Sequence, residues 1–243
     1  MVRLPARLTL KLAKARIAQI FNSAPAGPIL HCVDPAEVLH PGSTAPVSRE
    51  KVHALMENPA PVIWIGGNEP LLHAGIGHFV CALAQSGHCV FLETDGVALR
   101  RRIHEFQPQP ELFLAVRLDL LETADSALAA EGLRAARLSG FFTVIHTRVH
   151  EDLDFTQITT LRSLIAERDV DGWLVTAASS NKAVVCKAAE ARGVIRSSFW
   201  RRFSEHMEAA LLSQVPVTEF RDSQAFAAEG LHAEAGEEGV RIA

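Results

Sequence analysis

The chain has 243 residues, of which 48% are apolar and 21% are charged. An apolar fraction of this size supplies a substantial core, which excludes a chain that is disordered over most of its length. The net charge of -4 is mild, and no basic cluster carries interleaved aromatic residues, so we exclude a nucleic-acid partner.

The cysteines indicate a reducing compartment. The four of them, at positions 32, 81, 89 and 186, form neither a C-x2-C pair nor the dense framework of a small secreted domain. The sequence has no apolar run of 18 residues and no signal-peptide pattern. We therefore expect a cytoplasmic protein with free thiols, of which Cys81 and Cys89 lie in apolar, core-like contexts.

The first segment, residues 1–27, is predicted to be a basic amphipathic helix. It contains no acidic residue, and four of its apolar residues can share one helical face: Leu10, Ile17, Ile20 and Phe21. Its basic residues are Arg3, Arg7, Lys11, Lys14 and Arg16. Such a helix either packs on the open end of the domain that follows or lies on an anionic membrane as a peripheral contact.

Residues 28–196 alternate short apolar runs with longer helical patterns, which is typical of repeated β-α units around a parallel sheet. Strands are predicted at 29–33, 62–65, 89–93, 112–118, 141–149 and 172–176, and helices at 48–58, 74–86, 96–105, 123–138, 155–168 and 180–192. Eight such units close a TIM barrel, and only six fit here. We predict an α/β fold, a partial (open) TIM barrel of six βα units.

Residues 197–243 form the last predicted segment. A final amphipathic helix over 197–212 carries Phe199, Trp200 and Phe203. Residues 222–243 are rich in Ala, Glu and Gly, which predicts an acidic, mobile tail.

Polar residues follow every predicted strand. In parallel α/β barrels the loops at the carboxyl ends of the strands build the functional site. In chain order these ends are His31-Cys32-Val33-Asp34, Gly66-Gly67-Asn68-Glu69, Glu93-Thr94-Asp95-Gly96, Arg117-Leu118-Asp119, His146 to Asp152, and Thr176 to Ser180. The sequence thus predicts a polar site where the six ends meet.

The stretch from Pro61 to His73 runs from a buried strand through a glycine turn with one acid into a helix. Its Gly67-Asn68-Glu69-Pro70 resembles the Gly-Gly-Glu-Pro motif of the radical S-adenosylmethionine (SAM) superfamily. Thr94-Asp95-Gly96 is similar to that family's Thr-Asn-Gly strand end, and Leu118-Asp119 to its Leu-Asp, with Arg117 in place of a serine. The resemblance covers roughly residues 28–180 and is closest to the radical SAM enzymes of hopanoid side-chain synthesis.

The resemblance implies the same open barrel and a SAM pocket at the strand ends, in which the glutamate and the turn backbone hold the amino group of the methionine moiety. The cofactor-binding residues it suggests, together with the polar residues of the neighbouring strand ends, are Gly66, Gly67, Asn68, Glu69, Thr94, Asp95, Arg117, Asp119, His146 and Arg148.

The family's [4Fe-4S] cluster is not expected in this chain. The family binds it through C-x3-C-x2-C after the first strand, and if Cys32 is the first ligand the other two positions are Ala36 and Leu39. Cys32 is then a remnant or buried thiol, a metal ligand together with His31, Asp34 or His40, or a nucleophile.

The other polar residues leave alternatives open. Glu69 either contacts a ligand or pairs with Arg117 or Arg148, because a lone buried carboxylate is costly. His146, Arg148 and His150 alternate along one predicted strand, so they can form an anion site or, with His73, a divalent metal site, or the strand simply ends in solvent. Asp95 and Asp119 either bond ribose hydroxyls or cap the helices that follow.

Three functions follow from these alternatives. The first is a radical SAM-like protein without its cluster that binds SAM or a related small molecule, as an accessory member beside a partner enzyme. The second is a metal-dependent enzyme of another class that uses His, Cys and carboxylate ligands, with His31, Cys32 and His150 as candidates. The third is a structural partner subunit that docks through its barrel edge and residues 1–27.

Overall fold

A computed structural model describes residues 5–22, 28–34, 49–67, 69–118, 124–167 and 170–214. Two of the predicted site residues, Asn68 and Asp119, lie outside these ranges. The same holds for the loop positions Ala36 and Leu39 and for the predicted tail at 222–243.

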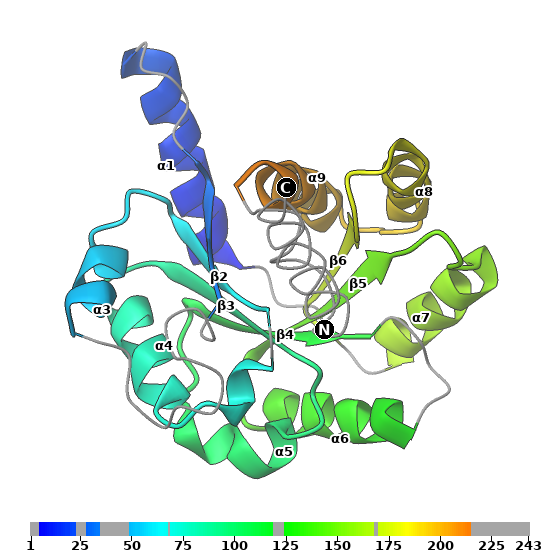
Figure 1. The fold of residues 1–243 in the computed structure, drawn as a ribbon, viewed down its shortest axis with the longest axis horizontal. Coiled ribbons are helices and arrows are strands. Elements are labelled where there is room, and N and C mark those ends of the chain that lie inside the picture. Colours follow the sequence, from blue (N-terminus) through cyan, green and yellow to red (C-terminus); the bar gives the residue numbers. More distant parts are fainter. Residues whose placement is uncertain are drawn as a thin grey trace, which may run out of the picture.

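The described strands form one parallel sheet in which every strand pairs with its neighbour in the sequence, in the order β1-β2-β3-β4-β5-β6. They are β1 (Leu30–Val33), β2 (Val62–Ile65), β3 (Cys89–Thr94), β4 (Leu112–Arg117), β5 (Phe142–Val149) and β6 (Gly172–Ala177). Figure 1 shows the sheet curled into a half-barrel. The predicted open barrel of six βα units is confirmed, and each predicted strand end agrees within one residue.

The helices between the strands cover the outer face of the sheet (Figure 1). They are α3 (Arg49–Met56), α4 (Ile76–Gln85), α5 (Leu99–Arg102), α6 (Ala124–Leu138), α7 (Phe155–Glu167) and α8 (Lys182–Arg192), with the short 3-10 turns η1 (Pro70–Leu72) and η2 (Ile103–Glu105). The single helix predicted over 96–105 is instead divided into α5 and η2. Gly96 has a φ of 81°, which no right-handed helix accommodates, so α5 begins three residues later.

The inner face of the sheet changes character along the strands. Towards the amino ends it holds a row of stacked aromatic rings, with centroids 5.6 Å apart between Trp64 and Phe91 and 4.5 Å between Phe91 and Phe113. Two residues further along the strands, polar side chains take over on this face. Because side chains alternate along a strand, Glu93 faces the same side as Phe91.

The last helix, α9 (Ser198–Gln214), closes the open side of the half-barrel. It packs against both edge strands, β1 and β6, and the Phe203 ring lies 5.5 Å from that of Phe91. The Ser204 hydroxyl accepts a hydrogen bond from the Val175 amide at 3.2 Å, and Glu208 accepts one from the Ala177 amide at 2.6 Å. The predicted final helix is confirmed, and it also covers the hydrogen-bonding edge of β6.

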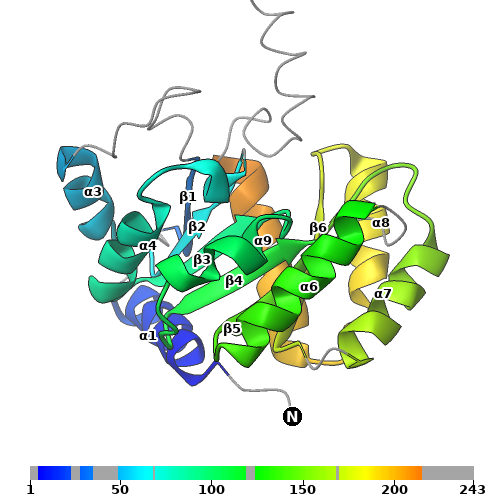
Figure 2. The same cartoon turned by 90° about the horizontal axis from the view of Figure 1, so that it is seen from below.

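The first helix, α1 (Ala6–Asn22), packs at the end of the barrel where the strands begin. Leu8 is fully buried, and Arg7 pairs with Glu111, which directly precedes β4. Leu10 and Ile17, two residues of the predicted face, remain 56% and 53% exposed, and the side chains of Ile20 and Phe21 lie outside the described residues. Figure 2 shows α1, in blue, at the lower edge of the molecule. In the described ranges, no helix has the length and apolarity needed to cross a membrane.

Candidate functional site

Glu69 links the turn after β2 to the end of β3. Its Oε1 accepts hydrogen bonds from the Thr94 hydroxyl at 2.6 Å and from the Leu71 amide at 3.1 Å, and its Oε2 accepts one from the Asp95 amide at 2.7 Å. Arg117 at the end of β4 lies 3.9 Å from Oε2. The carboxylate therefore receives partners from β3 and β4, and the pairing with Arg117 foreseen in the sequence is present.

Burial sets the pKa of Glu69. Loss of solvent raises the pKa above its ordinary value, and the bonds from Thr94 and from the Asp95 amide oppose that rise. Asp95 itself forms a turn, since its Oδ1 accepts from the Val97 amide at 2.9 Å. This bond lies ahead of α5, whose N-cap is Ala98 without a side-chain cap hydrogen bond, so Asp95 does not cap that helix.

The glycine pair after β2 makes room for acidic side chains. A Cβ on Gly66 would lie 2.7 Å from Glu93 Oε2 and 2.8 Å from Trp64 Nε1. A Cβ on Gly67 would lie within 2.2 Å of Asp34 Oδ2, and Gly67 also has a φ of 87°. Carboxylates from the ends of β1 and β3 thus lie against this turn, because only glycine permits such close approach.

A buried hydrogen-bonded chain lies directly beneath the turn. Glu93 Oε1 accepts from His146 Nδ1 at 2.7 Å, and His146 Nε2 lies 2.8 Å from the Thr176 hydroxyl. Glu93, His146 and Thr176 come from β3, β5 and β6, and each is at most 3% exposed. The chain therefore spans the inside of the half-barrel and fixes the imidazole orientation.

The charge around Glu93 is balanced by neighbouring cations. Burial alone raises its pKa, but the opposing effects of His146, Arg117 and Arg148 lower the pKa to about 2. Arg148 is 4% exposed, so it contributes a buried guanidinium to the same interior. Close by, the buried Trp64 Nε1 has no hydrogen-bond partner among the described residues.

The candidate metal ligands do not converge. His31 and Cys32 are neighbours within β1, so their side chains leave opposite faces of the sheet and do not bind one ion together. Burial, and next the charge of His88, lower the pKa of His31. His150 follows the end of β5 and is half-buried, while both ring nitrogens of His146 are already engaged. Across the described ranges, no three His, Cys, Asp or Glu residues are placed to hold a metal.

The thiols of the chain do not fit a [4Fe-4S] cluster. Cys32 lies inside β1, opposite Trp64, rather than in the loop that follows. Cys81 is on α4, Cys186 is on α8, and Cys89 opens β3 at the other end of the barrel. Burial raises the pKa of the Cys89 thiol to about 11. A [4Fe-4S] cluster needs three thiolates at one place, and Cys32 is the single cysteine near the carboxyl ends of the strands.

Most of the predicted site residues that the structure describes lie together. Gly66, Gly67, Glu69, Thr94, Asp95, Arg117, His146 and Arg148 all lie at the carboxyl ends of β2 to β5. Three further residues share this interior: Glu93 and Thr176, which the sequence places at strand ends but which are not among the cofactor-binding residues that the resemblance suggests, and Trp64. An acid at the end of an apolar strand, in alternation with Phe91, was the available signal for Glu93.

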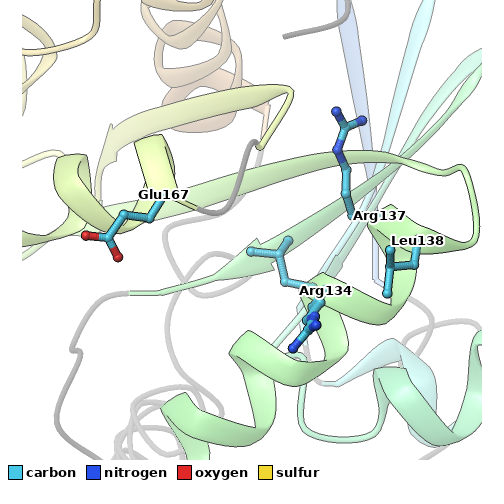
Figure 3. Close-up of a pocket in the computed structure, with 5 residues that line it drawn as sticks. Arg134, Arg137, Leu138 and Glu167 are labelled. Atoms are coloured by element: carbon cyan, nitrogen blue, oxygen red, sulfur yellow. The ribbon is translucent and has the colours of Figure 1, made fainter. Parts of the chain in front are cut away.

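Two cavities in the described part of the chain open away from this site. One, of about 440 Å³, lies between α6 and α7 and is lined by Arg134, Arg137, Leu138 and Glu167, which Figure 3 shows, and by Leu133. The other, of about 310 Å³, lies where β6 begins, between α7 and α9. Both are at the amino-end side of the strands, away from the polar cluster at the carboxyl ends.

No family model and no curated protein matches the chain. Among solved structures, it is similar to Streptococcus suis SuiB bound to S-adenosylmethionine, with 13% identity and a TM-score of 0.49 over 75% of this chain and 46% of that one. It is also similar to archaeal TYW1, with 14% identity and a TM-score of 0.43 over 82% of this chain and 68% of that one. The chain spans about half the length of the SuiB structures that it matches.

Proposed function

We propose that this is a radical SAM-like protein without the [4Fe-4S] site, which binds SAM or a related small molecule at the carboxyl ends of its strands. One observation carries the proposal. Glu69, Thr94, Asp95, Arg117 and Arg148 meet at one end of the half-barrel, in the order of the strand ends that resemble the superfamily, while Cys32 is the only thiol near it.

The charges at the strand ends suit a ligand that carries both signs. The carboxylates of Asp34 and Glu93 lie against the two glycines of the turn that precedes Glu69, and Arg117 and Arg148 bring two guanidinium groups close to Glu93. SAM carries a carboxylate, an ammonium and a sulfonium, so its amino-acid end matches this mixture. Reductive cleavage of SAM is not part of the proposal, because no three thiolates meet to hold the cluster. The protein would then act as an accessory subunit beside a partner enzyme.

The test is anaerobic purification and reconstitution with iron and sulfide, followed by iron analysis, visible absorbance and SAM titration by calorimetry. We expect no cluster, measurable SAM binding in wild type, and loss of that binding in Glu69→Ala. Glu190→Ala, which removes an exposed acid on α8, is the matched control and should bind SAM normally. Cluster formation, or SAM binding that survives in Glu69→Ala, would contradict the proposal.

A further inference from the structure

The cavity of about 310 Å³ at the start of β6 is a second site, distant from the carboxyl ends of the strands. Its walls come from α7, from the residues that lead into β6, and from the segment between α8 and α9. Val170, Trp173, Ile195 and Trp200 form its apolar surface, and each is at most 4% exposed. Its size lies at the lower end of the range of roughly 300–1,000 Å³ for small-molecule pockets.

The two indole N–H groups and the one carboxylate in these walls already have partners. Trp200 Nε1 donates to the Asp171 carbonyl at 2.8 Å, and Trp173 Nε1 donates to the Thr147 hydroxyl at 3.1 Å. The Asp171 carboxylate is fully buried and pairs with Arg137 at 3.0 Å. The wall formed by Trp173, Trp200 and Asp171 therefore offers a ligand no unpaired indole N–H or carboxylate.

Two arginine side chains at the cavity can bind an anionic group of a ligand. Arg162 on α7 and Arg196 before α9 both line it, both are exposed, and neither forms an ion pair or side-chain hydrogen bond with any residue in the described ranges. Among the described residues of the lining, Asp171 is the only acid, and it is already paired. An apolar chamber flanked by two uncompensated guanidinium groups complements a ligand with an apolar body and one anionic group.

The chamber is part of the packed structure rather than a loose surface gap. A Cβ on Gly172 would lie 2.4 Å from Trp200 Cε2, so the glycine is what lets the indole lie flat against β6 and form this wall. We propose that the cavity between α7, β6 and α9 binds a small amphipathic carboxylate, with its apolar body against Trp173 and Trp200 and its carboxylate on Arg162 and Arg196. This inference is independent of the proposed SAM site.

Octanoate is the probe, and octanol is its uncharged counterpart. Titration of the full chain is followed by calorimetry and by tryptophan fluorescence, because Trp173 and Trp200 line the cavity. We expect octanoate to bind more tightly than octanol. The double variant Arg162→Gln/Arg196→Gln should weaken octanoate by at least about tenfold, because both charge-assisted contacts are lost, and leave octanol unchanged. Arg202→Gln, an exposed arginine of α9 outside the cavity, is the matched control.

A second variant tests the cavity itself. Ala166 is exposed on α7 and lines the chamber, so Ala166→Phe fills the space without disturbing the core and should weaken octanoate and octanol together. Thermal unfolding confirms that each variant is folded. Absence of octanoate binding in wild type, an unchanged preference in the double glutamine variant, or unchanged binding in Ala166→Phe would each overturn the inference.

Discussion

His146 Nδ1 donates a hydrogen bond to Glu93 Oε1 at 2.7 Å, inside a half-barrel in which both side chains are almost completely buried. A carboxylate in such a place is costly unless it is paired. Here the pair is extended by the Thr176 hydroxyl and flanked by Arg117 and Arg148. The Glu93–His146 pair therefore couples strands β3 and β5 and makes the fold sensitive to the charge on Glu93.

Glu93→Gln should destabilise the protein at neutral pH by roughly 3 kcal/mol, because one partner of a buried charged pair is lost. Urea unfolding at pH 7 measures this change. Glu131→Gln removes the exposed partner of Arg100 and should cost less than about 1 kcal/mol. Equal free energies of unfolding for the two variants would show that the interior pair contributes no more than a surface pair.

The pKa of Glu93 also predicts how the free energy of unfolding changes at acid pH. The folded pKa of Glu93 is about 2, below its ordinary value of 4.5, so its ionisation stabilises the fold above pH 4.5. That contribution is lost as the pH falls from 4.5 towards 2. Unfolding free energies measured across this window should therefore fall more steeply in wild type than in Glu93→Gln. Parallel pH profiles would refute the assignment.

The Thr94 hydroxyl should influence both the pKa of Glu69 and the stability of the protein. Its hydroxyl donates to Glu69 Oε1 at 2.6 Å and lowers the pKa of a carboxyl that burial raises. Thr94→Val keeps the shape, removes the donor, and should raise the pKa of Glu69 further and cost about 1–2 kcal/mol of stability. Carboxyl titration by NMR and urea unfolding measure the two effects. Thr160→Val, at an exposed threonine of α7, is the control and should change neither.

Alanine variants of the two glycines with positive φ near η1 should distinguish backbone strain from steric crowding as causes of destabilisation. Gly67 and Gly75 have φ values of 87° and 80°, but only Gly67 has a neighbour, the Asp34 carboxylate, where a Cβ would lie. The left-handed backbone destabilises both alanine variants. Gly67→Ala should lose roughly 1–3 kcal/mol more of its unfolding free energy, because its Cβ also crowds the Asp34 carboxylate. Thermal unfolding of the two variants decides this, and similar melting temperatures would contradict it.

The sequence predicts the sheet better than it predicts the site. Apolar runs and helical periods locate all six strands because the inner and outer faces of a covered parallel sheet are both apolar. The site depends on contacts between distant residues. No local pattern shows that Glu93 meets His146 or that Gly66 makes room for Glu93. The role of α9 is equally non-local, since its partners are the edges of β1 and β6.

Glu208 on α9 should hold the β6 edge in place. Its Oε2 accepts from the Ala177 amide at 2.6 Å and from Arg192 at 2.8 Å, and both Glu208 and Arg192 are buried. Glu208→Ala leaves a buried guanidinium and an edge amide without this acceptor, so we expect a loss of about 3–5 kcal/mol. Glu205→Ala removes an exposed acid of the same helix and should be nearly neutral.

The consequence reaches beyond stability, because α9 is what covers the hydrogen-bonding edge of β6. When its anchor is weakened, the unpaired amides of Val175 and Ala177 become available to other chains. Glu208→Ala should therefore aggregate on mild heating, as followed by size-exclusion chromatography and light scattering. If the variant unfolds early but stays monomeric, α9 stabilises the barrel without protecting its edge.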